Sequence, residues 1–153
     1  MCIRDRYKGD LGFRSFRLDA SNVRPWNATK ADLANSLFDH LDHIDGTRTE
    51  EDLLYELLLK LGLDLCIPIR DQTIAAKTVH AVGGGVLLAC LDKRITSAEA
   101  EPLALGIADW RKDLDPAGDV TCVFRDSAFE NDVAKTNLAA ILEQHGIAKV
   151  RSL

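Results

Sequence analysis

The chain has 153 residues, of which 46% are hydrophobic, and its formal net charge is −5. This length permits one hydrophobic core, and the acidic charge argues against a chain that binds nucleic acid phosphates unaided. The sequence contains no apolar run of about 18 residues and no visible signal peptide, so it predicts no membrane span, and we expect a cytoplasmic protein.

The N-terminus begins with Met-Cys-Ile-Arg-Asp-Arg, residues 1–6, for which we find no structural role. The segment back-translates to a sequence like the mosaic end of a transposase-based sequencing library. We therefore expect residues 1–6 to be a translated adaptor scar that cuts the native reading frame at Tyr7; an ordinary charged N-terminus is the alternative. The aromatic-rich segment 12–19 is a strand candidate.

Two helices are predicted next, and together they make residues 20–62 a helical connector. Asparagines and a proline indicate a loop over 20–33, and Thr29 is a possible N-cap for a helix over 30–45. The second helix starts after Thr49, carries three acidic residues in its first turn and ends before Gly62. Its apolar stripe predicts a buried face and consists of Leu53, Leu54, Leu57, Leu58 and Leu61.

From residue 63 the apolar period changes to two, which predicts a strand over 63–70 with Pro68 at an edge or an end. Two apolar runs around Gly83-Gly84-Gly85 predict a hairpin over 77–92. A helix over 96–114, broken or started near Pro102, a strand over 120–124, a helix over 131–146 and a strand over 148–153 complete the chain. The sequence therefore predicts an α/β (α+β) fold, in which the helical connector precedes a small mixed β-sheet with a hairpin and two packed helices, residues 63–153.

The sequence offers weak signals for a metal or a phosphate. His40-x-x-His43 places two imidazoles at i, i+3 among acidic residues, but no third ligand is evident, and a solvated acidic helix face is favoured. Gly83-Gly84-Gly85 lacks the spacing of a phosphate loop and precedes a strand. The four cysteines, Cys2, Cys66, Cys90 and Cys122, form no C-x-x-C pair. Three of them lie in strand-like segments typical of reduced, buried thiols.

Polar residues gather after the strand predicted over 120–124. Asp126 and Ser127 place a carboxylate beside a hydroxyl, and Lys135 follows on the next helix, so a small hydrolase is one hypothesis. No G-x-S-x-G motif is present, and the same residues suit backbone hydrogen bonds where a strand ends. We favour a structural junction or an interface here, formed by Arg125, Asp126, Ser127, Phe129, Lys135 and Asn137.

Four segments together resemble the C-terminal region of the modification subunit of type III restriction–modification systems. These modification subunits are site-specific adenine DNA methyltransferases. They are GFRSFRLDASNVRPWN, RTEEDLLYELLLKLGLDL, KTVHAVGGGVLLACLD and VFRDSAFENDVAKTNLAAILEQHGIAKVRSL. The resemblance covers Gly12 to Leu153. The phrase F-R-D-S-x-F…D-x-x-K-T-N and the final K-V-R-S-L carry most of its specificity.

The resemblance implies a parent protein that methylates adenine with S-adenosylmethionine. The family's Asp-Pro-Pro-Tyr-type and Phe-x-Gly-x-Gly-type motifs are missing, and all four prolines are isolated. No catalytic or cofactor-binding residue of the family can therefore be placed on this chain, and whether the chain is itself an enzyme stays open. Residues 7–19 would be the orphaned end of the methyltransferase domain.

The resemblance also implies partners. The family's C-terminal region helps to assemble the complex with a second modification subunit and with the restriction subunit, a helicase-nuclease, while DNA is contacted by the remainder of the parent. An acidic chain suits a protein partner better than bare DNA. The first hypothesis is therefore an assembly domain of a prokaryotic methyltransferase, and the alternatives are a stand-alone α/β adaptor and the small hydrolase.

Overall fold

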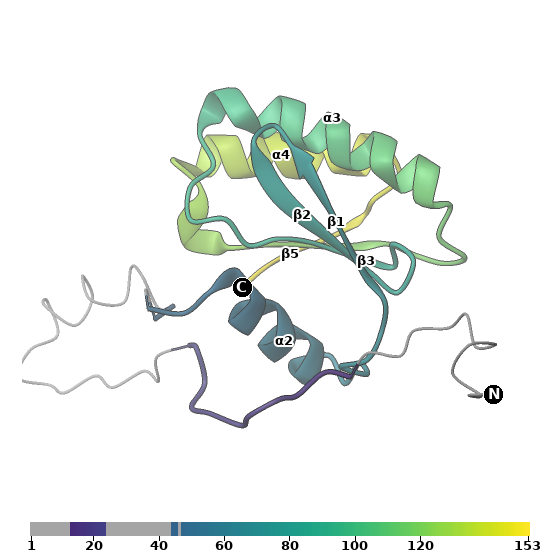
Figure 1. The fold of residues 1–153 in the computed structure, drawn as a ribbon. Coiled ribbons are helices and arrows are strands. Elements are labelled where there is room, and N and C mark those ends of the chain that lie inside the picture. The colour runs from purple at the N-terminus through teal and green to yellow at the C-terminus, as the bar shows by residue number, and fades with distance from the viewer. Residues whose placement is uncertain (1–12, 24–43, 46) are drawn as a thin grey trace, which may run out of the picture.

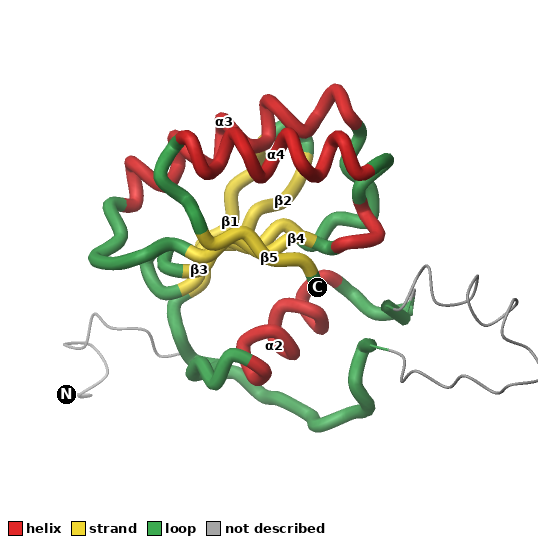
Figure 2. Tube along the Cα trace, turned by 180° about the vertical axis from the view of Figure 1, so that it is seen from behind, coloured by secondary structure: helices red, strands yellow, loops and turns green. Residues whose placement is uncertain are grey.

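The computed structural model describes residues 13–23, 44–45 and 47–153. Within these ranges the chain forms three layers: a five-stranded mixed sheet, one helix on one face and two helices on the other (Figure 1). The same layers are seen from behind in Figure 2, with α3 and α4 above the sheet and α2 below it. The predicted mixed α/β fold is confirmed.

The elements follow the predicted order of strand, hairpin, helix, strand, helix and strand after the first helix. They are α2 (Glu50–Lys60), β1 (Ile69–Ile74), β2 (Lys77–Val82), β3 (Leu87–Cys90), α3 (Ser97–Leu114), β4 (Thr121–Phe124), the 3₁₀ turn η2 (Asp126–Ala128), α4 (Asp132–Gln144) and β5 (Lys149–Ser152). The strands lie side by side in chain order. β1, β2 and β3 pair antiparallel, whereas β3, β4 and β5 pair parallel through the crossover helices α3 and α4.

Helix α2 begins and ends where its sequence signals place it. Thr49 is the N-cap, its hydroxyl accepts from the Asp52 amide, and the Asp52 carboxylate accepts from the Thr49 N–H at 2.9 Å. Gly62 follows the helix with a φ of +68°. The buried leucines of α2 share a core with Val82, Leu87, Ala89, Leu91 and Val123 of the sheet. The helix that we assigned to a connector therefore covers one face of the sheet.

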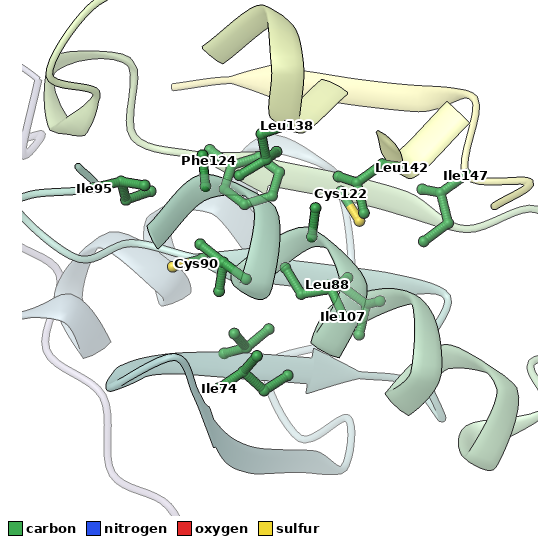
Figure 3. Packing of buried hydrophobic residues seen from close by; sticks show 14 of the residues in the cluster. Ile74, Leu88, Cys90, Ile95, Ile107, Cys122, Phe124, Leu138, Leu142 and Ile147 are labelled. Atoms are coloured by element: carbon green, nitrogen blue, oxygen red, sulfur yellow. The ribbon is translucent and has the colours of Figure 1, made fainter. Parts of the chain in front are cut away.

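The opposite face of the sheet packs against α3 and α4 in a second core. Figure 3 shows side chains from the strands, such as Leu88 and Phe124, meeting Ile107 of α3 and Leu138 of α4. The two cores use alternate residues of the same strands, because successive side chains point to opposite faces. The central strand β3 is buried on both faces for this reason.

The strand predicted over 63–70 is wrong for most of its length. Leu63, Leu65 and Ile67 do alternate in burial with exposed neighbours, but the segment turns around Asp64, whose carboxylate accepts from the Cys66 N–H at 2.8 Å. Because proline has no N–H to give to a ladder, β1 starts only after Pro68. The strand runs on to Ile74 and reaches β2 through a tight turn that the sequence did not reveal.

Two further predictions need correction. Segment 13–19 is not a strand and runs irregularly outside α2. The Phe16 ring packs edge-on against the Tyr55 ring, with the ring centroids 5.0 Å apart. The Arg14 guanidinium donates to the carbonyl oxygen of Leu65. Pro102 does not break α3, which runs unbroken through it. Pro102 and Ala98 are both exposed, so the Ala98 carbonyl oxygen that lacks a helical donor is open to water.

The helix predicted over 30–45 and the pair His40 and His43 lie outside the described residues, apart from Ile44 and Asp45. Ile44 is buried against α2 and forms an isolated antiparallel bridge with Val23. Among the helices that the structure describes, none is both long enough and apolar enough to cross a membrane.

Candidate functional site

The residues singled out after β4 lie at the carboxyl edge of the parallel strands, where α/β proteins commonly bind ligands. The backbone there is joined to both neighbouring segments. The Asp126 N–H donates to Leu153 O at 3.1 Å, which ties the junction to the end of β5. The Ile95 N–H donates to Ala128 O at 2.7 Å, which ties it to the loop before α3. These bonds hold the junction rigidly against the sheet.

The structure brings four of the predicted site residues together in two polar contacts. The Lys135 ammonium forms an ion pair with the Asp126 carboxylate and lies 3.4 Å from the Ser152 hydroxyl. The Arg125 Nε donates to the Ser127 hydroxyl at 2.9 Å. Arg125 is only 4% exposed although it carries a charge. A guanidinium does not release a proton at neutral pH, so this contact gives the Ser127 hydroxyl no general base.

The two remaining predicted residues lie apart from these contacts. Phe129 packs on Phe124 with ring centroids 6.0 Å apart and closes the end of the core. Asn137 is exposed on α4. The six residues therefore do not form one cluster. Four of them form two separate contacts, the ion pair of Lys135 with Asp126 and the hydrogen bond of Arg125 with Ser127.

The N-terminus of α3 lies at this edge and is occupied by two carboxylates from within the chain. Glu99 accepts from the N–H and the hydroxyl of Thr96, both at 2.8 Å. Glu130 accepts from the N–H and the hydroxyl of Ser97, both at 2.9 Å. The pKa of each carboxyl lies below its ordinary value because these hydrogen bonds favour the charged form. The positive end of α3 is thus neutralised internally.

A basic side chain completes this internal pairing. The Lys77 ammonium lies 3.4 Å from Glu99 and 3.7 Å from Asp92, and it joins the start of β2 to the N-terminus of α3. Asn131 caps α4 by accepting from the Ala134 N–H at 2.8 Å, and it donates to the Ser97 hydroxyl at 3.1 Å. The charged groups of this edge therefore hold the elements together.

One feature that the sequence did not indicate is a hollow of about 300 Å³ beside the ion pair. It lies between α4 and the edge strand β5. Its lining consists of Phe124, Phe129, Lys135, Leu138, Ala139, Glu143, Val150, Arg151 and Ser152. The i, i+4, i+8 spacing of Lys135, Ala139 and Glu143 shows in the sequence that these residues share one face of the helix. The spacing does not show which other element that face lies over.

A second feature that the sequence did not indicate is a histidine held between two carboxylates. His80, only 5% exposed, has its Nδ1 2.7 Å from Asp71 Oδ1 on β1. Its Nε2 lies 3.9 Å from Glu50 Oε2 at the start of α2 and has no hydrogen-bond partner among the described residues. Both nitrogens of this imidazole therefore lie near acidic side chains.

The structure also locates the cysteines. Cys90 and Cys122 are buried free thiols, and burial raises the pKa of each to about 12. Cys66 is free but exposed, contrary to the expected burial, because its segment is not a strand. Among the residues described, no three His, Cys, Asp or Glu side chains are grouped so that they could hold a metal ion.

Comparison with protein-family models and with curated proteins finds no match for this chain.

Proposed function

We propose that this chain is the C-terminal, non-catalytic part of the modification subunit of a type III restriction–modification system, and that it serves subunit assembly. The parent protein methylates the N6 of adenine in DNA with S-adenosylmethionine in a prokaryotic cytoplasm. The partners of this part are a second modification subunit and the restriction subunit, and DNA is bound by the remainder of the parent.

The observation that carries the assembly role is the internal pairing of charge at the carboxyl edge of the sheet. Glu99 and Glu130 both occupy the N-terminus of α3, Lys77 binds Glu99, and Asp126 binds Lys135. These charged side chains of the edge therefore serve contacts within the chain. A sheet edge whose charges pair with one another, with a hollow along one edge strand, suits contact with another protein.

The specific assignment to a type III modification subunit is supported by sequence resemblance. Its most distinctive phrase, F-R-D-S-x-F…D-x-x-K-T-N, falls on the β4–α4 junction, and K-V-R-S-L falls on β5. These are the two segments that border the hollow. The residues of the resemblance are therefore concentrated on one side of the molecule.

Co-purification tests the proposal. The untagged chain is co-expressed with a tagged type III restriction subunit and, separately, with a tagged intact modification subunit; we expect stoichiometric complexes that survive size-exclusion chromatography. The purified chain is also incubated with DNA and tritiated S-adenosylmethionine, and we expect no methyl transfer. Methyl transfer by the chain alone would contradict the proposal. A chain that elutes as a free monomer beside both tagged subunits would also contradict it, and would favour the stand-alone adaptor.

A further inference from the structure

Strand β5 is an edge of the sheet whose outer side no described strand covers. On its inner side the Leu153 N–H donates to Phe124 O at 2.8 Å, and Leu153 O accepts from the Asp126 N–H at 3.1 Å. The N–H and C=O groups of successive residues in a strand point in opposite directions. The backbone groups of Val150 and Ser152 therefore point outward, where they can pair with a further strand.

Helix α4 overhangs this edge and forms one wall of the hollow. Lys135, Ala139 and Glu143 lie one turn apart on that wall. Val150 and Ser152 present their side chains on the same side of the sheet: Val150 packs against the α3–α4 core, and Ser152 contacts Lys135. A strand laid beside β5 would place alternate side chains in this hollow, and the apolar residues of its lining, Phe124, Phe129, Leu138, Ala139 and Val150, favour apolar ones.

The opposite side of β5 carries positive charge. By the alternation of a strand, the side chains of Lys149 and Arg151 leave β5 on the side of Leu153, which packs toward the α2 core, and Arg151 also borders the hollow. Lys149 is paired with Asp119 at 3.0 Å, whereas the structure records no hydrogen bond or ion pair of the exposed Arg151 guanidinium with any residue that it describes. A second copy of β5 in antiparallel register would set Arg151 against Arg151 or Lys149, and like charges directly opposite are unfavourable. The edge thus disfavours self-pairing and suits an acidic strand.

We propose that the outer edge of β5 and the hollow under α4 bind an extended segment of a partner protein as an added strand. Its acidic side chains lie beside Arg151, and its alternate, apolar side chains enter the hollow. Glu143, at the rim of the hollow, repels acidic side chains from the α4 side and so fixes which face of the segment is acidic. This inference rests on the proposed assembly function and names the kind of partner segment.

A synthetic peptide tests the binding mode on the full chain. The probe is a fluorescein-labelled, end-blocked peptide of alternating glutamate and valine, and the control replaces each glutamate with lysine. We expect saturable binding of the glutamate peptide by fluorescence anisotropy, affinity for the lysine peptide weaker by about tenfold or more, and slower amide exchange of Val150 and Ser152 in the complex. Equal binding of both peptides, or unchanged exchange in β5, would overturn the proposal.

Three variants locate the site. Arg151→Glu is expected to reverse the preference between the two peptides, and Ala139→Phe to abolish binding by filling the hollow at constant charge. Arg70→Glu, an exposed arginine on the opposite edge strand β1, is the matched control and should bind as the wild type does. Circular dichroism confirms that each variant is folded. Equal weakening by Arg151→Glu and Arg70→Glu would identify nonspecific charge attraction and refute the site.

The same variants separate this inference from the assembly proposal. If the type III subunits co-purify with the wild-type chain and also with Arg151→Glu and Ala139→Phe, assembly stands and the β5 site fails. If they do not co-purify with any form, but the glutamate peptide still binds and the variants still act on it, the type III assignment fails and the β5 site stands.

Discussion

Gly106 lies where α3 packs closely against Ile74 of β1. A Cβ atom added there would lie 2.2 Å from the Cγ2 atom of Ile74, well inside van der Waals contact. The backbone of Gly106 is ordinary helix that any residue can adopt. Glycine is needed here because there is no space for a side chain. In contrast, Gly62 and the glycines of the β2–β3 turn have positive φ, which is why the sequence could predict their roles and could not predict that of Gly106.

We predict that Gly106→Ala destabilises the protein by about 1 kcal/mol, because overpacking costs about 1–3 kcal/mol and outweighs the helix propensity gain of about 1 kcal/mol. Urea denaturation measures the change. Gly118→Ala, where nothing lies within 4 Å of the added Cβ, is the control and should be neutral or slightly stabilising. In an Ile74→Ala background the penalty should disappear; a penalty that persists there would show that the contact with Ile74 is not its cause.

At the scale of elements, helix ends were the most predictable features. Thr49, Asn131 and Gly146 all lie where their residue types favour a helix boundary. The missed boundary is the turn between β1 and β2, where Ala75 and Ala76 adopt φ values of +50° and +62°. Alanine rarely takes this conformation, so the sequence carried no turn signal, and residues 71–74 were not predicted as strand.

The carboxylates at the N-terminus of α3 predict how stability depends on pH. Hydrogen bonds from the backbone N–H and the hydroxyl of Thr96, with Lys77 nearby, hold the pKa of Glu99 below its ordinary value. A carboxyl whose folded pKa is lowered contributes stability that is complete above the unfolded pKa of about 4.3 and is lost as the pH falls through the folded value. Glu130 follows the same rule through Ser97.

We therefore predict that Glu99→Gln lowers the urea midpoint at pH 7 and flattens the decline of that midpoint below about pH 4. Urea titrations from pH 7 to about pH 2.5 measure both effects. Glu101→Gln, an exposed position on the same helix, is the control and should follow the wild-type curve. A Glu99→Gln curve parallel to that of the wild type at all pH values would show that the cap does not contribute to the acid response.

At the scale of the whole molecule, the sequence predicted the order of the elements and the presence of a mixed sheet. It did not predict that α2 covers the second face. A stripe of leucines establishes that a helix has a buried face, but the same stripe fits a separate connector equally well. The contact became visible only through the shared core of Leu58 with Val82 and Val123. The hollow beside β5 was missed for the same reason, since it depends on how two elements overlap.

The shared core predicts the outcome of truncation. We expect residues 63–153 alone to lack cooperative unfolding and to bind the dye ANS, because removing α2 exposes the apolar face of β2, β3 and β4. The full chain should unfold in one cooperative transition without binding the dye. Urea denaturation followed by tryptophan fluorescence and by circular dichroism compares the two. A truncated chain with the same urea midpoint as the full chain would contradict the role given to α2.

The position of α2 before the sheet has a consequence for synthesis on the ribosome. Its leucines leave the ribosome first, yet the last strand residue that they contact, Val123, follows Lys60 by about 63 residues. At elongation rates of about 5–20 residues per second, this core therefore stays incomplete for roughly 3–13 s. α4, in contrast, follows the four strands β1 to β4 in the chain. We infer that nascent chains need a holdase chaperone at α2 during this interval. Ribosome-bound chains that end near residue 118, before β4, should therefore keep this chaperone bound.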